Sequence, residues 1–454
     1  MQLSSPWTPR LEDLPGTPCE RLVRALAADI AAGLVPPGSR LPAHRDLAWR
    51  LGIALGTVTK AFGILERRGL VQGVNGRGTF VAGQPSRDFG RIDLSANVPP
   101  RMLSDRLLAA ALSSIAKRLD AGTFCSYAPP NGRVDHRRLL ARWLAECGMP
   151  ASSDRVLICN GAQHALSIAL AVACRPGSIL LTETLTYPGA LMIARQIGVR
   201  IVGLSMDEQG ITPEALAEAL DRECGEARRV LYLTPTLQNP TGATMGVGRR
   251  RAIVRLCRRH DVLIVEDDVH SAFRDAGVAP LATLAPERTL HVTGLSKVLS
   301  PGLRIGCLVT PECLLEGALT ELRASSTTAP LLSCLIMADW LADGTARQVA
   351  DAIVDESARR FELARQALPS LAPSSRPGFH AWLPMHLAAA EEISRIADRN
   401  GVTLPAPRAF MADEGQARSG VRISLGGPNL AELQRGLGIL ATALASVEEA
   451  GFPT

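Results

Sequence analysis

The sequence predicts two structural units: a small helical unit with a β wing over residues 14–82, and a larger α/β unit over residues 93–452. Three observations support this division. The small unit has apolar residues at helical spacing, followed by two short strand-like runs around a glycine-rich turn. The larger unit alternates short apolar runs with amphipathic helical patterns, which predicts a mostly parallel sheet covered by helices. Residues 83–92 are rich in glycine, proline and polar residues, a composition typical of a linker.

Three helices are predicted in the small unit. They are CERLVRALAADIAAGLV, then AHRDLAWRLG, which ends at Gly52, then GTVTKAFGILERRGL. Val58, Phe62 and Leu65 share one side of the third helix, so this side is expected to pack against the other helices. The stretch VQGVNGRGTFV then predicts the two strands of the wing.

The small unit is also the basic part of the chain. Residues 18–81 contain nine Lys or Arg and four Asp or Glu, an excess of +5 that equals the net charge of the whole chain. A basic unit of three helices and a wing favours binding to the DNA backbone.

The overall composition excludes several classes of protein. Hydrophobic residues make up 46% and charged residues 20% of the chain, as in a packed globular protein. No apolar run reaches the ~18 residues of a membrane span, and no signal peptide is recognised. The 10 cysteines show neither a CxxC pair nor metal-ligand spacing, so we expect buried thiols in a reducing cytoplasm and no metal site.

Lysine is rare in this chain, and Lys297 stands among small and apolar residues in TGLSKVLSPGLRIG. The other lysines are Lys60 and Lys117, and every remaining basic residue is arginine. Lysine differs from arginine in having a primary amine that loses its proton easily when buried. Such an amine can form a Schiff base with an aldehyde, and pyridoxal phosphate is the foremost aldehyde cofactor. On this pattern alone, an ordinary surface lysine is an equal alternative.

Polar groups stand at the ends of several strand-like runs, which is where ligands bind in parallel sheets. VLICNGAQ ends in small residues ahead of a helix, which suits a phosphate at the helix N-terminus. Asn239 follows RVLYLTP, and the three acidic residues 266–268 follow a buried run, where they need cationic partners or a polar site. Arg304 comes seven residues after Lys297. Pyridoxal phosphate requires this set of an amine, a carboxylate, an amide and an anion-binding loop.

The small unit resembles the GntR-type winged helix-turn-helix in the stretches GLVPPGSRLPAHRDLAWRLG, GTVTKAF, ERRGLV and GRGTFV. This family places its third helix in the major groove and its wing against the adjacent backbone or minor groove. By position, the resemblance implies contacts with phosphates or bases for Arg45 and Lys60, a place at the groove for Thr57, and a wing formed by Arg77, Gly78 and Thr79.

The start of the third helix departs from this family. Many members have a capping Ser or Thr followed by an Arg that reads guanine. Here the stretch reads Ala54, Leu55 and Gly56, so the usual guanine contact is absent. The fold prediction is unaffected, whereas the family's base-reading rules do not transfer.

The larger unit resembles the class I and II aminotransferases of pyridoxal-phosphate fold type I, from about residue 93 to the C-terminus. The resemblance implies a large domain with a mostly parallel sheet and a smaller α+β domain. Lys297 matches the Schiff-base lysine, and Asp267 matches the aspartate that keeps the pyridine nitrogen protonated. Asn239, in NPTG, matches the amide that binds the ring hydroxyl, and Tyr187, in TYPGA, matches the tyrosine that stacks on the ring.

The remaining matched positions concern the phosphate and the ligand. Ala162 and Gln163 match the phosphate loop, and Arg304 matches the phosphate-binding arginine. Tyr127, in YAPPNG, matches the tyrosine that a partner subunit lends to the phosphate. Arg422, in VRISLGG, matches the arginine that binds a substrate carboxylate.

Two positions of this match are altered. The family usually has a Tyr three residues after the Asp, where His270 stands here, and a hydroxyl residue three before the Lys, where Gly294 stands. We therefore expect His270 and the nearby Ser296 to contact the cofactor. These changes favour a site kept for binding in which catalysis is weakened or lost.

Together, the two units resemble the MocR/GabR-type regulators, in which a GntR-type winged helix is fused to an aminotransferase-like domain. The resemblance implies pyridoxal phosphate as cofactor, operator DNA and an amino-acid-like effector as partners, and a cytoplasmic homodimer in which Tyr127 completes the neighbouring site. Three functions stay open: a transcription factor that responds to such an effector, a working aminotransferase with an appended winged helix, and a sensor of pyridoxal phosphate alone.

Overall fold

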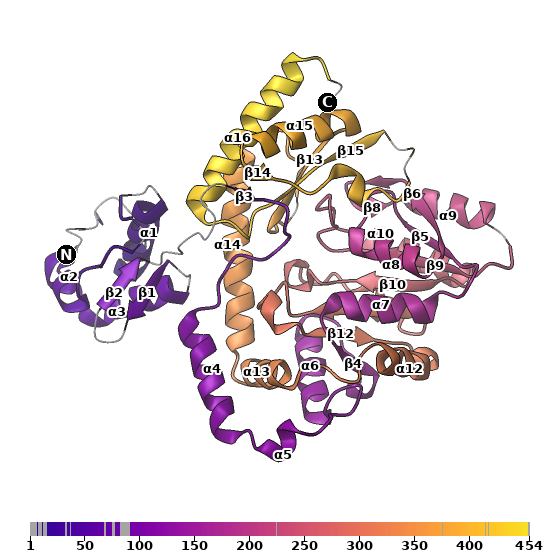
Figure 1. The fold of residues 1–454 in the computed structure, drawn as a ribbon, viewed down its shortest axis with the longest axis horizontal. Coiled ribbons are helices and arrows are strands. Elements are labelled where there is room, and N and C mark those ends of the chain that lie inside the picture. Colours follow the sequence, from indigo (N-terminus) through magenta and orange to yellow (C-terminus); the bar gives the residue numbers. More distant parts are fainter. Residues whose placement is uncertain are drawn as a thin grey trace.

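A small N-terminal unit and a larger α/β body make up the chain, and both predicted units are present (Figure 1). The structure is a computed structural model, and it describes residues 7, 11, 16–31, 34–36, 38–67, 70–74, 78–81, 91–223, 225–374, 376–413, 415 and 417–452. Most of the linker predicted over residues 83–92 lies outside these residues, as does Arg77 of the predicted wing.

The N-terminal unit has the predicted three helices and β wing. It contains α1 (Pro18–Ala31), α2 (His44–Leu51) and α3 (Leu55–Arg67), followed by the antiparallel strands β1 (Val71–Val74) and β2 (Gly78–Val81). Gly52 ends α2 in the left-handed conformation with φ 63°, as expected for a glycine C-cap. The predicted packing side of α3 is buried in a core made by all three helices, which includes Leu22, Leu26, Leu47, Val58, Phe62 and Leu65.

A seven-stranded sheet forms the centre of the larger body, with the strand order β4-β12-β11-β10-β9-β5-β6. All neighbouring pairs are parallel except those made by β12, which runs antiparallel to both β11 and β4. The strands are β4 (Val156–Cys159), β5 (Ile179–Glu183), β6 (Arg200–Leu204), β9 (Arg229–Leu233), β10 (Leu263–Asp267), β11 (Thr289–Gly294) and β12 (Gly306–Val309).

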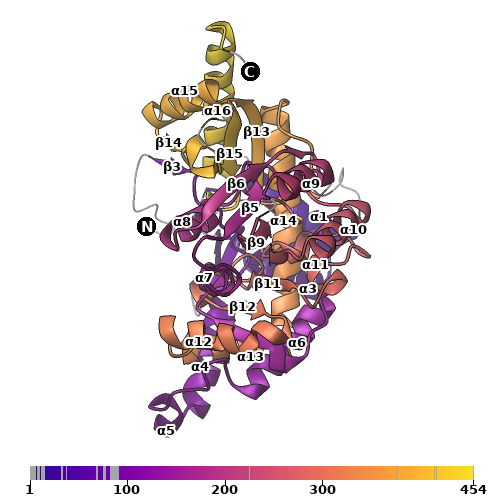
Figure 2. The same cartoon turned by 90° about the vertical axis from the view of Figure 1, so that its right-hand side faces the viewer.

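Helices cover both faces of this sheet because its strands are apolar on both sides (Figure 2). Val230 and Tyr232 of β9 pack with α7 (Ala162–Ala173), α8 (Pro188–Gln196) and α12 (Leu315–Ser325). The alternate residues Leu231 and Leu233 pack on the other face, with α9 (Pro213–Arg222), α10 (Val247–Arg259) and α11 (Leu281–Leu284). The sheet is thus buried between two helical layers, and its functional groups must emerge at the strand ends.

A smaller α+β part, also expected, lies at the C-terminal end of the chain. The antiparallel strands β13 (His380–His386) and β15 (Arg418–Ser424) pack with α15 (Leu387–Arg399) and α16 (Leu430–Glu449). Beside them, β3 (Ile92–Asp93) pairs in parallel with β14 (Val402–Thr403). The segment that follows the linker is therefore held by the C-terminal part of the chain.

The remaining helices complete the body around the sheet. They include α4 (Asp105–Arg118), α5 (Ala121–Phe124), α6 (Val134–Glu146), α13 (Leu331–Ala342) and the 23-residue α14 (Thr345–Ala367), while the short strands β7 (Met206–Asp207) and β8 (Gly210–Ile211) form a hairpin. Among the described helices, none is long and apolar enough to cross a lipid bilayer.

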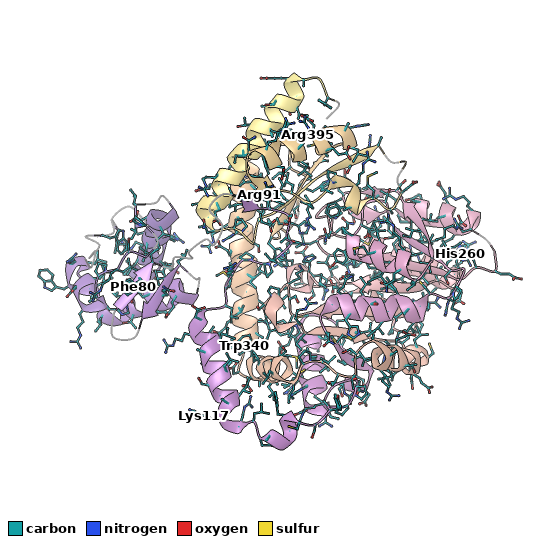
Figure 3. The ribbon with its side chains drawn as sticks, viewed as in Figure 1. Phe80, Arg91, Lys117, His260, Trp340 and Arg395 are labelled. Carbon is teal, nitrogen blue, oxygen red and sulfur yellow. The ribbon has the colours of Figure 1, made fainter. Side chains whose placement is uncertain are left out.

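Buried ion pairs hold two of the three acidic residues at the end of β10. Asp268 pairs with Arg274, and both side chains are buried. We expect Arg274→Met to lower the free energy of unfolding by about 3–5 kcal/mol, because it leaves the Asp268 charge buried without a cation. Urea denaturation measures this loss. Arg395→Met, which breaks an exposed pair with Glu392 on α15 (Figure 3), should leave the stability close to that of the unaltered protein, and an equal loss in both variants would contradict the expectation.

Candidate functional site

Asp267 differs from its two acidic neighbours because none of the described cations forms a direct ion pair with it, and Lys297 acts on it only from a longer distance. Glu266 accepts hydrogen bonds from the backbone of α11 and lies 3.0 Å from His291 and 3.5 Å from Arg250. The only side chain that hydrogen bonds to Asp267 within the described structure is that of Tyr232, across 3.1 Å to Oδ2, and Oδ1 has no partner there. Burial raises the pKa of Asp267 to about 6. Asp267 is thus the carboxylate left free for a ligand with a proton donor.

Lys297 follows β11, the strand next to β10, and its amine interacts with Asp267 electrostatically. Its Nζ donates a hydrogen bond to the backbone oxygen of Asn97 and lies 6.0 Å from the centre of the Phe379 ring. Burial, together with the positive charges of Arg422 and Arg304, lowers the pKa of Lys297 to about 8. A considerable neutral fraction near pH 8 suits the amine for attack on an aldehyde.

Arg422 and Asn239 lie together at this site although they are far apart in the sequence. Arg422, on β15, donates from Nη1 to Asn239 Oδ1 across 3.0 Å and from Nη2 to the backbone oxygen of Ser95. Its guanidinium lies 5.0 Å from the centre of the Phe410 ring. Burial lowers the pKa of Arg422 to about 10, so the side chain is still cationic at neutral pH. Nε has no hydrogen-bond partner in the described part of the chain. A buried arginine with an unused donor suits an anionic ligand.

The loop predicted to bind the phosphate lies where β4 ends and α7 begins at Ala162. Gly161 has φ 84°, and a Cβ at this position would lie 2.5 Å from Nη2 of Arg304. Arg304 itself has φ 51° and donates from Nη2 to the backbone oxygen of Asn160 across 3.4 Å. A helix N-terminus and a guanidinium at one place are typical of a phosphate site.

The two remaining predicted residues on this side form a hydrogen-bonded pair. The Tyr187 hydroxyl donates to Gln163 Oε1 across 2.8 Å, and Gln163 Nε2 donates to the backbone oxygen of Gly189 across 3.3 Å. A Cβ at Gly189 would lie 2.5 Å from the Tyr187 ring, so glycine allows the ring to take this position.

His270 lies buried in an aromatic cluster beside the site. Its ring centre is 5.4 Å from that of Phe379 and 5.6 Å from that of His380. Burial holds the pKa of His270 well below its usual value, so the imidazole is neutral, and its Nε2 has no partner among the residues that the structure describes. The predicted Ser296 also has a buried hydroxyl without a partner there.

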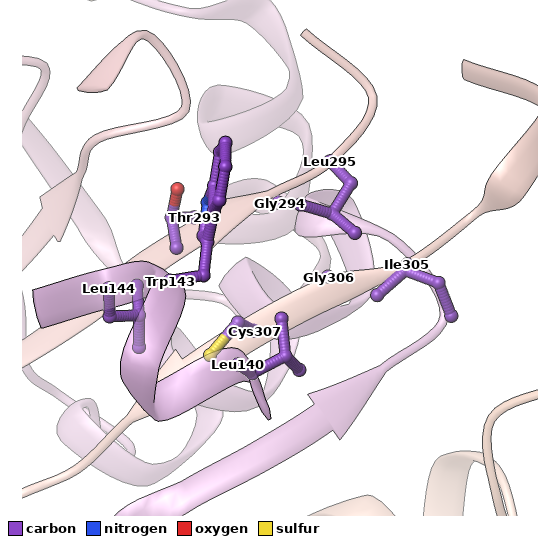
Figure 4. A pocket seen from close by; sticks show the side chains of 9 residues that line it. All are labelled: Leu140, Trp143, Leu144, Thr293, Gly294, Leu295, Ile305, Gly306 and Cys307. Atoms are coloured by element: carbon purple, nitrogen blue, oxygen red, sulfur yellow. The ribbon is translucent and has the colours of Figure 1, made fainter. Parts of the chain in front are cut away.

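The structure gives a steric reason for Gly294, the altered position before Lys297. Gly294 pairs with Gly306 where β11 and β12 meet, and a Cβ on Gly294 would lie 2.9 Å from the backbone oxygen of Ile305. A small cavity lies behind this strand pair (Figure 4). Leu140, Trp143 and Cys307 help to line it, and none of the predicted site residues does. The cavity is therefore separate from the candidate site.

Tyr127 is not brought to the site within one chain. Its side chain is 83% exposed and lines a different surface hollow, together with Thr123, Arg133 and Leu331. A contribution of Tyr127 to a phosphate site therefore requires a second copy of the chain.

The predicted DNA-contacting residues are accessible on the small unit. Arg45 on α2 and Lys60 on α3 are exposed, and Thr57 is half-buried three residues before Lys60. Residues three apart on a helix lie on the same side, so Thr57 and Lys60 share one face of α3. Gly78, at φ 107°, and Thr79 begin the second strand of the wing.

Sequence reasoning missed several residues of the site. Tyr232 and His380 are buried beside Asp267 and His270, and the carbonyl groups of Ser95 and Asn97 accept hydrogen bonds from Arg422 and Lys297. Tyr232 was detectable in principle, since it is the third of only three tyrosines and stands in the strand-like run before Asn239.

The fold and the site define a DNA-binding winged helix joined to a domain of the aminotransferase type. Residues 90–440 match the family model "Aminotransferase class I and II", and residues 18–81 match "Bacterial regulatory proteins, gntR family". The chain belongs to the class I and II aminotransferase family. With its N-terminal unit, it is a GntR-type regulator fused to an aminotransferase-like domain.

Individual proteins match long parts of the chain. The chain is 27% identical to the HTH-type transcriptional regulator YdeF of Bacillus subtilis, over 96% of both chains. It is 28% identical to the HTH-type pyridoxine biosynthesis transcriptional regulator PdxR of Corynebacterium glutamicum, over 62% of this chain and 63% of PdxR. The α-aminoadipate aminotransferase LysN of Thermus thermophilus, solved with N-(5'-phosphopyridoxyl)-L-leucine, superposes with a TM-score of 0.71 at 25% identity, over 80% of this chain and 94% of LysN.

Proposed function

We propose that this protein is a DNA-binding transcriptional regulator whose aminotransferase-like domain holds pyridoxal phosphate and binds an amino-acid-like effector. The observation that carries the proposal is that the charges of Lys297, Asp267 and Arg422 interact in one site of a chain that also contains a winged helix. A regulator of this kind works where its DNA is, which places it in the cytoplasm.

Pyridoxal phosphate is the cofactor implied by the aminotransferase family, and the residues present fit it. Asp267 Oδ1 and Ser296 Oγ are buried polar atoms without partners among the described residues, and the missing Cβ of Gly161 lets the Arg304 guanidinium lie against the start of α7. In the proposal, Ala162, Gln163, Ser296 and Arg304 bind the phosphate, while Asp267, Asn239, Tyr187 and His270 hold the ring. The bound cofactor supplies an aldehyde for Lys297 and an electron-withdrawing pyridinium ring.

The effector class follows from Arg422 and Lys297. A guanidinium binds a carboxylate through two parallel hydrogen bonds, and a primary amine can replace Lys297 on the cofactor aldehyde. An amino acid or a similar amine carries both groups. The phosphopyridoxyl-leucine in LysN is a compound of cofactor and amino acid, which supports this choice.

A route from the site to the winged helix is supported by the backbone partners of these residues. Lys297 donates to the carbonyl of Asn97 and Arg422 to that of Ser95, in the segment that directly follows the linker. A cofactor on Lys297 and a carboxylate on Arg422 would take over these donors and release the segment. A ligand shifts an equilibrium only if it binds one arrangement of the protein more tightly than the other. Here the ligands compete with the carbonyl groups of Ser95 and Asn97, so they bind more tightly to the arrangement in which the segment is released.

Hydrogen exchange tests this route. We expect peptides covering residues 94–98 to exchange faster when the protein holds pyridoxal phosphate and an amino acid that alters its DNA affinity. The paired strand β14 serves as internal control, since its partners are Ile92, Asp93 and Leu94, which precede the carbonyl groups of Ser95 and Asn97. Unchanged exchange at 94–98 under conditions that alter DNA binding would contradict the route.

We further propose a homodimer in which Tyr127 completes the phosphate site of the partner subunit. Other exposed apolar side chains stand on α4, on α5 and on α13, which packs against α4: Leu108, Leu112, Phe124 and Leu332. An apolar surface of this kind is typical of an interface.

DNA binding should depend on Arg45 and Lys60. We expect Arg45→Ala and Lys60→Ala each to weaken operator binding and to lower the slope of log affinity against log salt by about one unit, because each removes one phosphate contact. Fluorescence anisotropy over a salt series measures both quantities. Lys117→Ala, which removes an exposed cation of the large body, is the matched control. A C-terminal part that binds the operator as tightly as the full chain would refute the assignment.

A working aminotransferase is the second candidate, since Lys297 and Asp267 are both kept and the fold matches that of LysN. A turnover assay with amino acids and 2-oxo acids decides between the two. Turnover without any effect of amino acids on DNA binding would favour the enzyme.

A further inference from the structure

Tyr232 is a tyrosine for which the proposed function gives no role. It lies on β9, fully buried in the core between the sheet and α7. It is paired in register with Val265 of β10, and Asp267 stands two residues further along on the same face. This geometry brings the hydroxyl to 3.1 Å from Asp267 Oδ2.

The surroundings allow Tyr232 only one role in this hydrogen bond. Burial and the carboxylates of Asp267 and Glu183 raise its pKa well above the usual value, so the phenol stays protonated and acts as donor. The other ionisable groups that act on Asp267 or Tyr232 are Asp268, Lys297 and Tyr187. Of these, only Lys297 can be positive, and it is assigned to the cofactor aldehyde.

We propose that Tyr232 is a positioning residue for Asp267: it holds Oδ2, leaves Oδ1 free for the protonated ring nitrogen of the cofactor, and keeps the carboxylate ionised. The inference rests on the proposed cofactor site. A hydrogen bond to a charged acceptor favours the charged form, and it also fixes the plane of the carboxylate. The neighbouring carboxylates have other partners: Arg250 and His291 contact Glu266, and Arg274 contacts Asp268. Tyr232 is the corresponding partner of Asp267.

The test is the pH dependence of pyridoxal phosphate binding in Tyr232→Phe. Removing the donor raises the pKa of Asp267 above its value of about 6 in the unaltered protein. Just above pH 6, a larger fraction of the carboxyl group is then neutral in the variant. We expect the midpoint of the affinity profile to shift upward by about one to two pH units, a tenfold to hundredfold change in proton affinity. The loss of affinity should be largest at pH values between the midpoints of the unaltered protein and the variant. It should become smaller at alkaline pH, where Asp267 is ionised in both proteins. The cofactor phosphate and Lys297 titrate in both proteins, so the difference between the profiles isolates Asp267.

Two further variants make the outcome decisive. Tyr232→Met also removes the donor while filling the apolar site, and it should give the same shift. Ser357→Ala removes another buried hydroxyl, on α14, and should leave the midpoint unchanged. A uniform loss of affinity at every pH would show a purely structural role and overturn the proposal, as would an unshifted midpoint. Failure of the unaltered protein to bind pyridoxal phosphate would instead refute the proposed function.

Discussion

Lys297→Ala should abolish covalent retention of pyridoxal phosphate completely. Lys297 is the lysine whose amine acts on Asp267, and the arginines of the site, Arg304 and Arg422, have no primary amine that could replace it. The unaltered protein should be yellow, and borohydride reduction should fix the cofactor on the peptide that contains Lys297. Because the pKa of this lysine is lowered to about 8, attachment of added cofactor should become faster as the pH rises towards that value and the amine loses its proton.

The matched control for this experiment is Lys117→Ala. Lys117 is an exposed residue near the outer end of α4, and its replacement should leave both the absorption spectrum and the reduced peptide unchanged (Figure 3). An absorption spectrum that is the same in Lys297→Ala and in the unaltered protein would refute the assignment of the cofactor lysine.

Local patterns in the sequence were sufficient to select some residues of the candidate site. Lys297 was selected by its residue type. Nearly all basic residues of the chain are arginine, and arginine cannot form a Schiff base with an aldehyde, so a lysine at this position indicates that its amine is used. The placement of Asp267 followed from the rule that ligands meet the carboxyl ends of parallel strands. The choice of Asp267 over Glu266 and Asp268 depended on family resemblance, and the structure now adds a physical reason, because both neighbours are paired with cations.

The parts that sequence reasoning missed depend on contacts between distant residues. The carbonyl groups of Ser95 and Asn97 meet Arg422 and Lys297 across 327 and 200 residues, and a backbone carbonyl leaves no signal in residue type. Tyr232 has an apolar ring that suits a buried strand, so periodicity alone gives its hydroxyl no role. These are the groups that decide which atoms of the site are free, and they appear only when β9, β10, β15 and the segment after the linker are placed together.

Arg422→Ala should abolish the response to the effector while leaving cofactor attachment intact. Truncating one partner of a buried, hydrogen-bonded charge pair costs about 2–5 kcal/mol, which lowers affinity for a carboxylate ligand at least about 30-fold. Lys297, Asp267 and the phosphate loop lie on other elements, so the cofactor should still attach to Lys297. Because the Arg422 charge helps to lower the pKa of Lys297, attachment is compared above pH 8, where the amine is largely neutral. The measurement is operator affinity in the presence of each common amino acid, with the spectrum recorded in parallel.

Arg418→Ala is the control, because this arginine begins the same strand β15 four residues earlier and is exposed. It should respond to the same amino acid, and at the same concentration, as the unaltered protein. The competing function is a sensor of pyridoxal phosphate alone, in which Arg422 has no ligand to bind. In that case Arg422→Ala would regulate as the unaltered chain does, and only the cofactor would alter DNA binding. The amino-acid dependence of operator affinity in these two variants therefore separates the two kinds of regulator, since only an effector with a carboxylate needs the guanidinium of Arg422.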